Sequence, residues 1–158
     1  MRETTITASA IISFTQKLED RSAALYERLA ALFTVQRELF QAFAGEDSKN
    51  KKLIVRTYQE TITDALEACY AFEGMRLEDY EVNTEIPDSA SYADALGLAI
   101  GVEEKACEFY LDVAERSQSL LATIPMAFKR VAKKRNKRKS NLQALLHEES
   151  VASLEQEK

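Results

Sequence analysis

Glycine and proline, the residues that most often interrupt helices, are scarce in this chain. Its 158 residues include four glycines and two prolines, against 46% hydrophobic and 30% charged residues. A β-rich domain of this size needs many tight turns, which draw heavily on glycine and proline. The composition therefore favours long helices. At this length we expect a single domain, residues 1–158, that buries about two thirds of its unfolded surface.

Cysteine, histidine and long apolar runs are also scarce, and each scarcity excludes a class of protein. No apolar run approaches the roughly 20 residues needed to span a bilayer, and the N-terminus lacks the basic-then-apolar pattern of a signal peptide. Cys69 and Cys107 form neither a CxxC motif nor a disulfide framework, so we expect a cytoplasmic protein with reduced cysteines. The single histidine, His147, limits the metal sites that the chain can build.

Basic residues are concentrated in one stretch of an otherwise acidic chain. The net charge is −5, yet eight of the eleven residues from Lys129 to Lys139 are basic and none is acidic. Such a run can bind nucleic acid at the surface, or some of its cations can point into the protein core. The two interpretations predict different functions.

Apolar residues recur at alternating steps of four and three over four segments, which is the spacing of amphipathic helices. Three sites have the composition of helix starts. Thr34 offers an N-cap. Ser91 has an acidic residue, Asp94, three positions later, in a pattern like a capping box, and Thr123 has a proline, Pro125, two positions later.

The order of these segments predicts two antiparallel helix hairpins joined by one long crossover. Hairpin one covers about residues 5–73, an acidic crossover covers 74–91, and hairpin two covers 92–149. Short turns within each pair and one long connection between the pairs define the ferritin-like form of the all-α four-helix bundle. Because an unbroken second helix would overrun its neighbours, we expect a kink or a short extra helix at 62–73.

Two pairs of segments show that the halves of the chain are similar. Residues 18–30 and 102–114 share Glu, Tyr and Ala at an offset of 84, and residues 40–50 align with 128–138 at an offset of 88. In the second alignment the core-facing positions coincide. The pattern indicates an internal repeat of one helix hairpin.

Each apolar stripe is interrupted near its middle by charged or amide side chains. These are Glu19 in the first helix, Asp47 and Asn50 in the second, Glu103 in the third, and Arg135 and Arg138 in the fourth. Buried charge is unfavourable unless it is paired or metal-bound, so interruptions at matching depth predict one shared polar site. The alternative is that helix rotation places some of these residues at the solvent edge.

This pattern resembles the rubrerythrin branch of the ferritin-like superfamily over nearly the whole chain. Helices one and three of that family each carry a Glu seven residues before a Tyr, and EDRSAALY (19–26) and EEKACEFY (103–110) are similar. The run FEGMRLEDYEVNTEIPDSASYADALGLAI (72–100) also looks like members of this branch. Helices two and four of the family each carry Glu-x-x-His, and the six side chains hold two iron ions. The resemblance implies a ferritin-like fold and an ancestral di-iron oxidoreductase activity.

The residues that would hold metal depart from the family pattern. Asp47-x-x-Asn50 replaces one Glu-x-x-His, and Arg135-x-x-Arg138 replaces the other. Guanidinium groups do not deprotonate and they repel a divalent ion within a few Å. We therefore expect the arginines to stand where ligands stood, to pair with the carboxylates of the layer, and to leave the protein without metal or another cofactor.

Four residues near this layer have predicted roles of their own. Tyr26 and Tyr110 would in the family hydrogen-bond to ligand carboxylates, and here they either do the same or serve as plain core aromatics. Cys107 lies one turn past Glu103 and is expected to be a packed thiol. His147 lies off the stripe, so we expect it to be exposed and unable to complete a metal site.

Three hypotheses for the function follow. The first is a non-catalytic structural, interaction or regulatory module that forms a homodimer. The second is a non-haem di-iron oxidase or peroxidase that retains metal through Glu19, Asp47 and Glu103. The third is polyanion binding by the outer face of the fourth helix, although the chain lacks interleaved aromatics and a recognition-helix motif, which disfavours nucleic acid. The basic residues expected in solvent are Lys129, Arg130, Lys133, Lys134, Lys137 and Lys139.

Overall fold

The computed structural model of the chain describes residues 6–61, 75–117 and 123–156, and no strand occurs among them. Four α-helices account for most of the described residues. Their bounds are α1 Ala8–Leu32, α2 Arg37–Thr61, α4 Tyr92–Arg116 and α5 Thr123–Gln156. The prediction of an all-α protein is confirmed.

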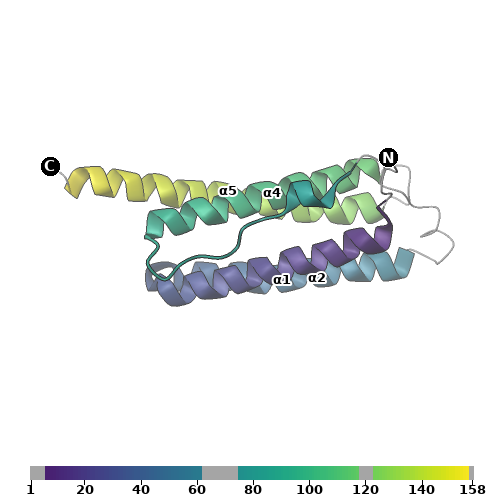
Figure 1. Cartoon of the computed structure of the whole chain (residues 1–158), viewed down its shortest axis with the longest axis horizontal. Coiled ribbons are helices and arrows are strands. Elements are labelled where there is room, and N and C mark those ends of the chain that lie inside the picture. Colours follow the sequence, from purple (N-terminus) through teal and green to yellow (C-terminus); the bar gives the residue numbers. More distant parts are fainter. Residues whose placement is uncertain (1–5, 62–74, 118–122, 157–158) are drawn as a thin grey trace.

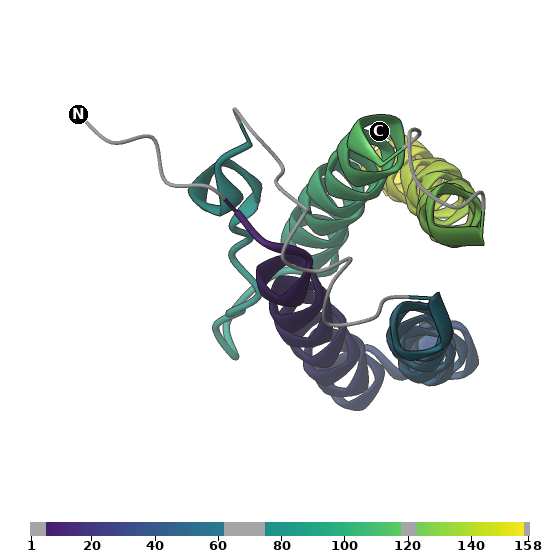
Figure 2. The same cartoon turned by 90° about the vertical axis from the view of Figure 1, so that its right-hand side faces the viewer.

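The four helices lie side by side as two antiparallel pairs (Figures 1 and 2). α1 and α2 form one hairpin, and α4 and α5 form the other. Seen end-on in Figure 2, α1 lies beside α4, and α2 lies beside α5. The connection from Met75 to Ser91 runs back along the bundle, so that α4 begins at the same end as α2.

The crossover is packed against the bundle along its length. It contains one 3-10 turn, η2 (Leu77–Tyr80), and buries the side chains of Met75, Tyr80 and Ile86. The hydroxyl of Tyr80 donates to Asp112 Oδ2 of α4 at 2.5 Å. Because its apolar residues join the core, the crossover holds the two hairpins together.

Two of the predicted helix starts lie where the sequence placed them, and the third was wrong. Ser91 accepts from the backbone N–H of Asp94 at 3.0 Å, and the Asp94 side chain accepts from the N–H of Ser91 at 3.4 Å, which completes a capping box at the start of α4. α5 begins at Thr123. Thr34, in contrast, opens a 3-10 turn, η1 (Thr34–Gln36), and α2 begins only at Arg37. Between α1 and α2 the chain reverses direction in this 3-10 turn, so Thr34 belongs to the turn and is not the N-cap of α2.

The end of α5 lies further along the chain than predicted. α5 continues to Gln156, past the expected boundary at residue 149, and Figure 1 shows its last turns beyond the end of the bundle. Residues 149–156 contain no glycine or proline, so nothing in the sequence stops the helix. The kink or extra helix expected at 62–73, and Cys69, lie outside the described residues.

Apolar residues fill the bundle as two clusters, one toward each end. One cluster includes Ile11, Leu18, Ile54, Phe109, Val113 and Val131, and the other includes Leu25, Leu29, Phe40, Leu96 and Leu142. Between them lies a layer of buried polar side chains. In the described part of the chain, no helix is long and apolar enough to cross a bilayer.

Candidate functional site

The six core-facing polar residues meet in this layer. All are buried, with exposures of 1% for Glu19, 0% for Asp47, Asn50, Glu103 and Arg135, and 2% for Arg138. Each of the four helices contributes at least one of them, because each apolar stripe is interrupted at the same depth. The alternative that helix rotation exposes some of them does not hold in this structure.

Arg135 of α5 lies at the centre of the layer and contacts three carboxylates. Its Nη2 lies 2.6 Å from Glu19 Oε2 and 3.1 Å from Asp47 Oδ1, and its Nη1 lies 2.8 Å from Glu103 Oε1. Nη1 also donates to the hydroxyl of Ser22 at 3.0 Å. Ser22 is buried on the inner face of α1 and was not among the predicted site residues. A serine on a helix face is too common to have indicated this contact.

Arg138, one turn further along α5, connects the layer to α2. Its Nη1 donates to Asp47 Oδ1 and lies 3.4 Å from Glu103 Oε1. Its Nη2 donates to the backbone carbonyl of Phe43 at 3.2 Å and lies 3.3 Å from the half-buried carboxylate of Glu46. The guanidinium carbon is 5.1 Å from the centre of the Phe43 ring, within the range of a cation–π contact.

The two tyrosines hydrogen-bond to carboxylates of the opposite hairpin. Tyr26 in α1 donates to Glu103 Oε1 of α4 at 2.5 Å, and Tyr110 in α4 donates to Glu19 Oε1 of α1 at 2.5 Å. A separation of seven residues places each tyrosine about 10 Å along its own helix from its own glutamate, so only the antiparallel neighbour is within reach. Of the two roles left open by the sequence, hydrogen bonding is the one observed. Burial and the adjacent carboxylate raise the pKa of both phenols well above the ordinary value.

Asn50 shares the layer but not its bonds. Within the described part of the chain, neither atom of its side-chain amide has a hydrogen-bond partner, and the same is true of Asp47 Oδ2 and Glu103 Oε2. The arginines are therefore held by Glu19, Asp47 and Glu103, and not by the amide.

The layer carries more negative than positive charge. It contains three carboxylates and two guanidinium groups, all within the buried core. Burial raises the pKa of Glu19 from 4.5 to about 7 against the opposing effect of Arg135, and the charge of Asp47 adds to the increase. Burial alone would lower the pKa of Arg135, but Glu103, Glu19 and Asp47 raise it well above its ordinary value. Burial is therefore the main cause of the Glu19 shift, whereas the neighbouring carboxylates cause the Arg135 shift.

The raised pKa of Glu19 predicts how the unfolding free energy depends on pH. Because Glu19 binds a proton more tightly in the folded chain than in the unfolded one, the native state holds more protons between about pH 4.5 and about pH 7. The stability that proton binding to Glu19 adds should be fully present below pH 4.5. It should decline as the pH rises toward 7, by about 1.4 kcal/mol for each pH unit over this interval. Urea unfolding at several pH values measures this slope.

Two variants of α1 isolate the effect. Glu19→Gln keeps the shape of the neutral side chain and should flatten the slope over this interval. Glu27→Gln, at an exposed position of the same helix, should leave it unchanged. If Glu19→Gln retains the full slope, another group is responsible for it.

The residues of the layer do not fit a pair of iron ions. The nitrogens of Arg135 lie between Glu19 and Glu103, where a cation shared by those carboxylates would lie. Among the described residues, no group of three or more His, Cys, Asp or Glu side chains is arranged to hold a metal ion. His147 is exposed, and the thiol of Cys107 donates to the carbonyl of Ala132 at 3.5 Å. Burial raises the pKa of this thiol, as expected for a packed cysteine.

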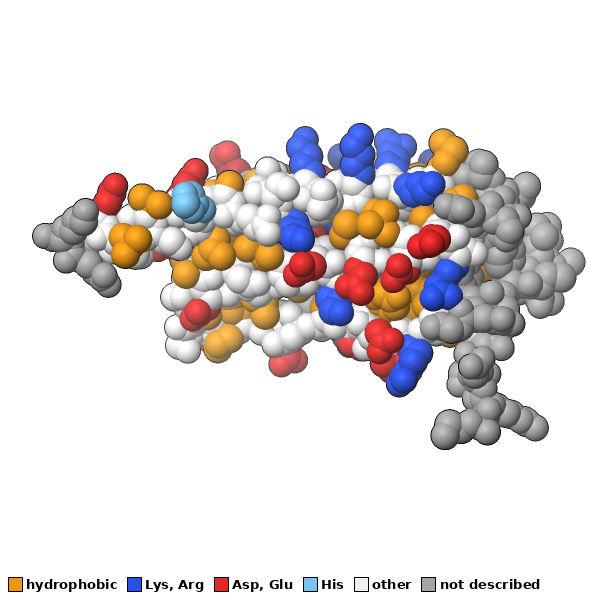
Figure 3. All heavy atoms as spheres, turned by 90° about the horizontal axis from the view of Figure 1, so that it is seen from above, with side chains coloured by type: hydrophobic (Ala, Val, Ile, Leu, Met, Phe, Trp, Pro, Cys, Tyr) orange, Lys and Arg blue, Asp and Glu red, His pale blue; other side chains and the backbone are white. Residues whose placement is uncertain are grey.

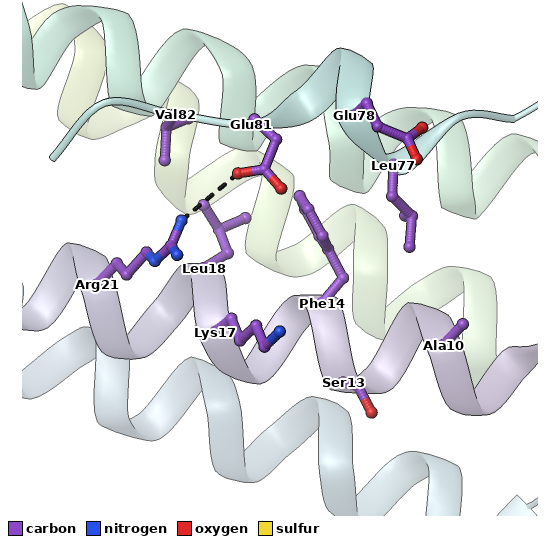
Figure 4. Close-up of a pocket in the computed structure, with 10 residues that line it drawn as sticks. All are labelled: Ala10, Ser13, Phe14, Lys17, Leu18, Arg21, Leu77, Glu78, Glu81 and Val82. Atoms are coloured by element: carbon purple, nitrogen blue, oxygen red, sulfur yellow. Dashed lines mark hydrogen bonds and ion pairs between the residues drawn. The ribbon is translucent and has the colours of Figure 1, made fainter.

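A groove of about 310 Å³ lies outside the bundle, between α1 and the crossover (Figure 4). Phe14, Leu18, Leu77 and Val82 line it with apolar surface. Its polar side chains are Ser13, Lys17, Arg21, Glu78 and Glu81, and the Arg21 and Glu81 side chains form an exposed ion pair across it at 3.4 Å. Since both charged partners face solvent, this pair adds little stability, and the groove lacks the buried polar groups of a specific site.

The predicted basic surface of α5 is present but uneven. Lys129, Arg130, Lys133 and Lys137 are exposed, whereas Lys134 and Lys139 are half-buried. Lys139 pairs with Glu104 at 3.2 Å. Figure 3 shows Lys and Arg side chains in a row along one edge of the molecule, with acidic side chains following toward its C-terminal end.

The chain has no significant match to a protein-family model, to a curated protein sequence or to a solved structure.

Proposed function

We propose that this chain is a rubrerythrin-like member of the ferritin-like superfamily in which arginine–carboxylate ion pairs replace a di-iron centre. In this proposal the protein is a non-catalytic structural, interaction or regulatory module. The observation that carries the proposal is the position of Arg135, whose two terminal nitrogens lie 2.6 Å from Glu19 and 2.8 Å from Glu103. The single long crossover and the crosswise Tyr–Glu hydrogen bonds support the family relationship.

The physical argument concerns charge. Three carboxylates that converge in an apolar core repel one another, so such a core forms only if cations or protons accompany them. A di-iron protein supplies the cations as metal ions. Here Arg135 and Arg138 supply them, and a guanidinium group has neither a second oxidation state nor an open coordination position. The layer therefore stabilises the fold without providing redox chemistry.

Metal analysis of the natural protein tests the proposal. The protein is expressed with added iron, purified without chelators and measured for iron and zinc by elemental analysis. We expect neither metal in proportion to the chain. About two iron ions per chain would overturn the proposal and support an oxidase that binds metal through Glu19, Asp47 and Glu103.

A further inference from the structure

The outer face of α5, opposite the polar layer, has a regular pattern that the fold does not use. Nine of its exposed residues form one stripe along the helix, at alternating steps of four and three: Met126, Arg130, Lys133, Lys137, Ser140, Ala144, His147, Val151 and Leu154. Residues at these steps lie on one side of a helix, where a second helix can pack along them. The stripe is about 42 Å long.

The last turns of α5 lack support from their own chain. They extend beyond the other helices in Figure 1, and Val151 and Leu154 are 41% and 64% exposed. A helix end without tertiary contacts is only marginally stable in water. Val151 and Leu154 lie one turn apart on this end, so together they can pack against another molecule.

Basic and acidic residues occupy different halves of the same face. The first half presents Lys129, Arg130, Lys133 and Lys137, and the second half presents Glu148 and Glu155. A parallel pair of such helices would place like charges together, whereas an antiparallel pair places each basic half against an acidic half. Ser140 and Ala144, near the middle, are small enough to let the two backbones approach where the helices cross.

We propose that a second copy of this chain docks antiparallel along the outer face of α5. The two-fold axis passes near Ser140 and Ala144, so the contact is self-complementary and closes at two copies. The aliphatic stems of Arg130 and Lys133 cover Val151 and Leu154 of the second copy, and their charged ends reach toward its glutamates. This interface depends on the outer face of α5 and not on the loss of metal.

A polyanion fits the same surface less well. Nucleic acid would cover the basic half of the stripe, but Glu148 and Glu155 continue the same face with charge that repels phosphate. A second copy of the chain, in contrast, places charge of opposite sign against both the basic and the acidic half. Nucleic acid that co-purifies in a salt-dependent way with a monomeric chain would therefore overturn the proposal.

Light scattering at micromolar concentration tests the dimer. The natural chain should have about twice the mass of one 17.8 kDa chain. Glu148→Lys with Glu155→Lys should abolish the dimer, and adding Arg130→Glu with Lys137→Glu to the same chain should restore it, because these are basic positions that face residues 155 and 148 of the second copy about the proposed axis. The matched control, Glu27→Lys with Glu38→Lys, reverses two exposed charges on the first hairpin and should remain dimeric.

Cross-linking tests the orientation. Ala144→Cys lies close to the proposed axis and should form a disulfide between two copies under mild oxidation. Lys129→Cys, far from the axis, should not, and the natural chain treated in the same way gives the background from its own cysteines. A monomeric natural chain, a dimer that survives the reversal of both glutamates, or efficient cross-linking only at position 129 would each overturn the proposal.

Discussion

Arg135→Ala should lower the free energy of unfolding by about 3–5 kcal/mol, because it leaves buried carboxylates without their partner. Glu19, Asp47 and Glu103 all contact this side chain, and all three are buried. Lys137→Ala, an exposed neighbour on the same helix, should leave the unfolding free energy close to that of the natural chain. Urea unfolding followed by circular dichroism measures both.

A paired variant separates lost ionic pairing from lost packing. Arg135→Met keeps most of the side-chain volume but removes the charge, and it should also be strongly destabilising. Adding Glu19→Gln removes one of the stranded carboxylates and should recover part of the loss.

The Arg138→Ala variant should also unfold far more easily than the Lys137→Ala variant, although one carboxylate partner of Arg138, Glu46, is more accessible to solvent. Equal stability of the Arg138→Ala and Lys137→Ala variants would show that the ion pairs do not hold the core.

Restoring the ligands should restore metal binding. The quadruple variant Asp47→Glu, Asn50→His, Arg135→Glu and Arg138→His recreates two Glu-x-x-His pairs beside the glutamates of α1 and α4. We expect it to bind about two iron or zinc ions per chain, because this is the ligand set of di-iron four-helix bundles. Elemental analysis and iron-dependent absorbance measure the result.

A matched control keeps the arginines. Asp47→Glu with Asn50→His supplies one complete Glu-x-x-His but leaves both guanidinium groups in the layer, so it should bind no metal. If this double variant binds metal as well as the quadruple variant does, the arginines do not exclude it. If neither binds, the four helices do not hold the geometry of a di-iron site.

Helical spacing was sufficient to predict which side chains share the core. A residue on an amphipathic stripe faces the neighbouring helices wherever the helix ends lie, so Glu103 and Arg135 could be placed in the core from spacing, and in one layer once the two hairpins were predicted. The exact helix ends were harder, since Thr34 has the composition of an N-cap but lies in a 3-10 turn. α5 also continues to Gln156 because no residue stops it.

The bonds within the layer were not predictable from spacing. Which tyrosine meets which glutamate depends on the direction of the neighbouring helix, and the sequence specifies the pairing only once α1 and α4 are known to be antiparallel neighbours. Ser22 accepts a hydrogen bond from Arg135, yet a serine on a helix face is too common to suggest that role. Asn50 was expected only to lie in the layer, and its amide makes no bond to a described residue.

The crosswise bonds between the hairpins also fix their alignment. Apolar contact alone fixes the relative position of long helices weakly, because the hydrophobic effect is not directional. Here a shift of one hairpin past the other by one turn, about 5.4 Å, would remove Tyr110 from Glu19, Tyr26 from Glu103 and Arg135 from Glu19 together. The bundle therefore has one permitted longitudinal setting, and its hairpins should dock or separate in a single step.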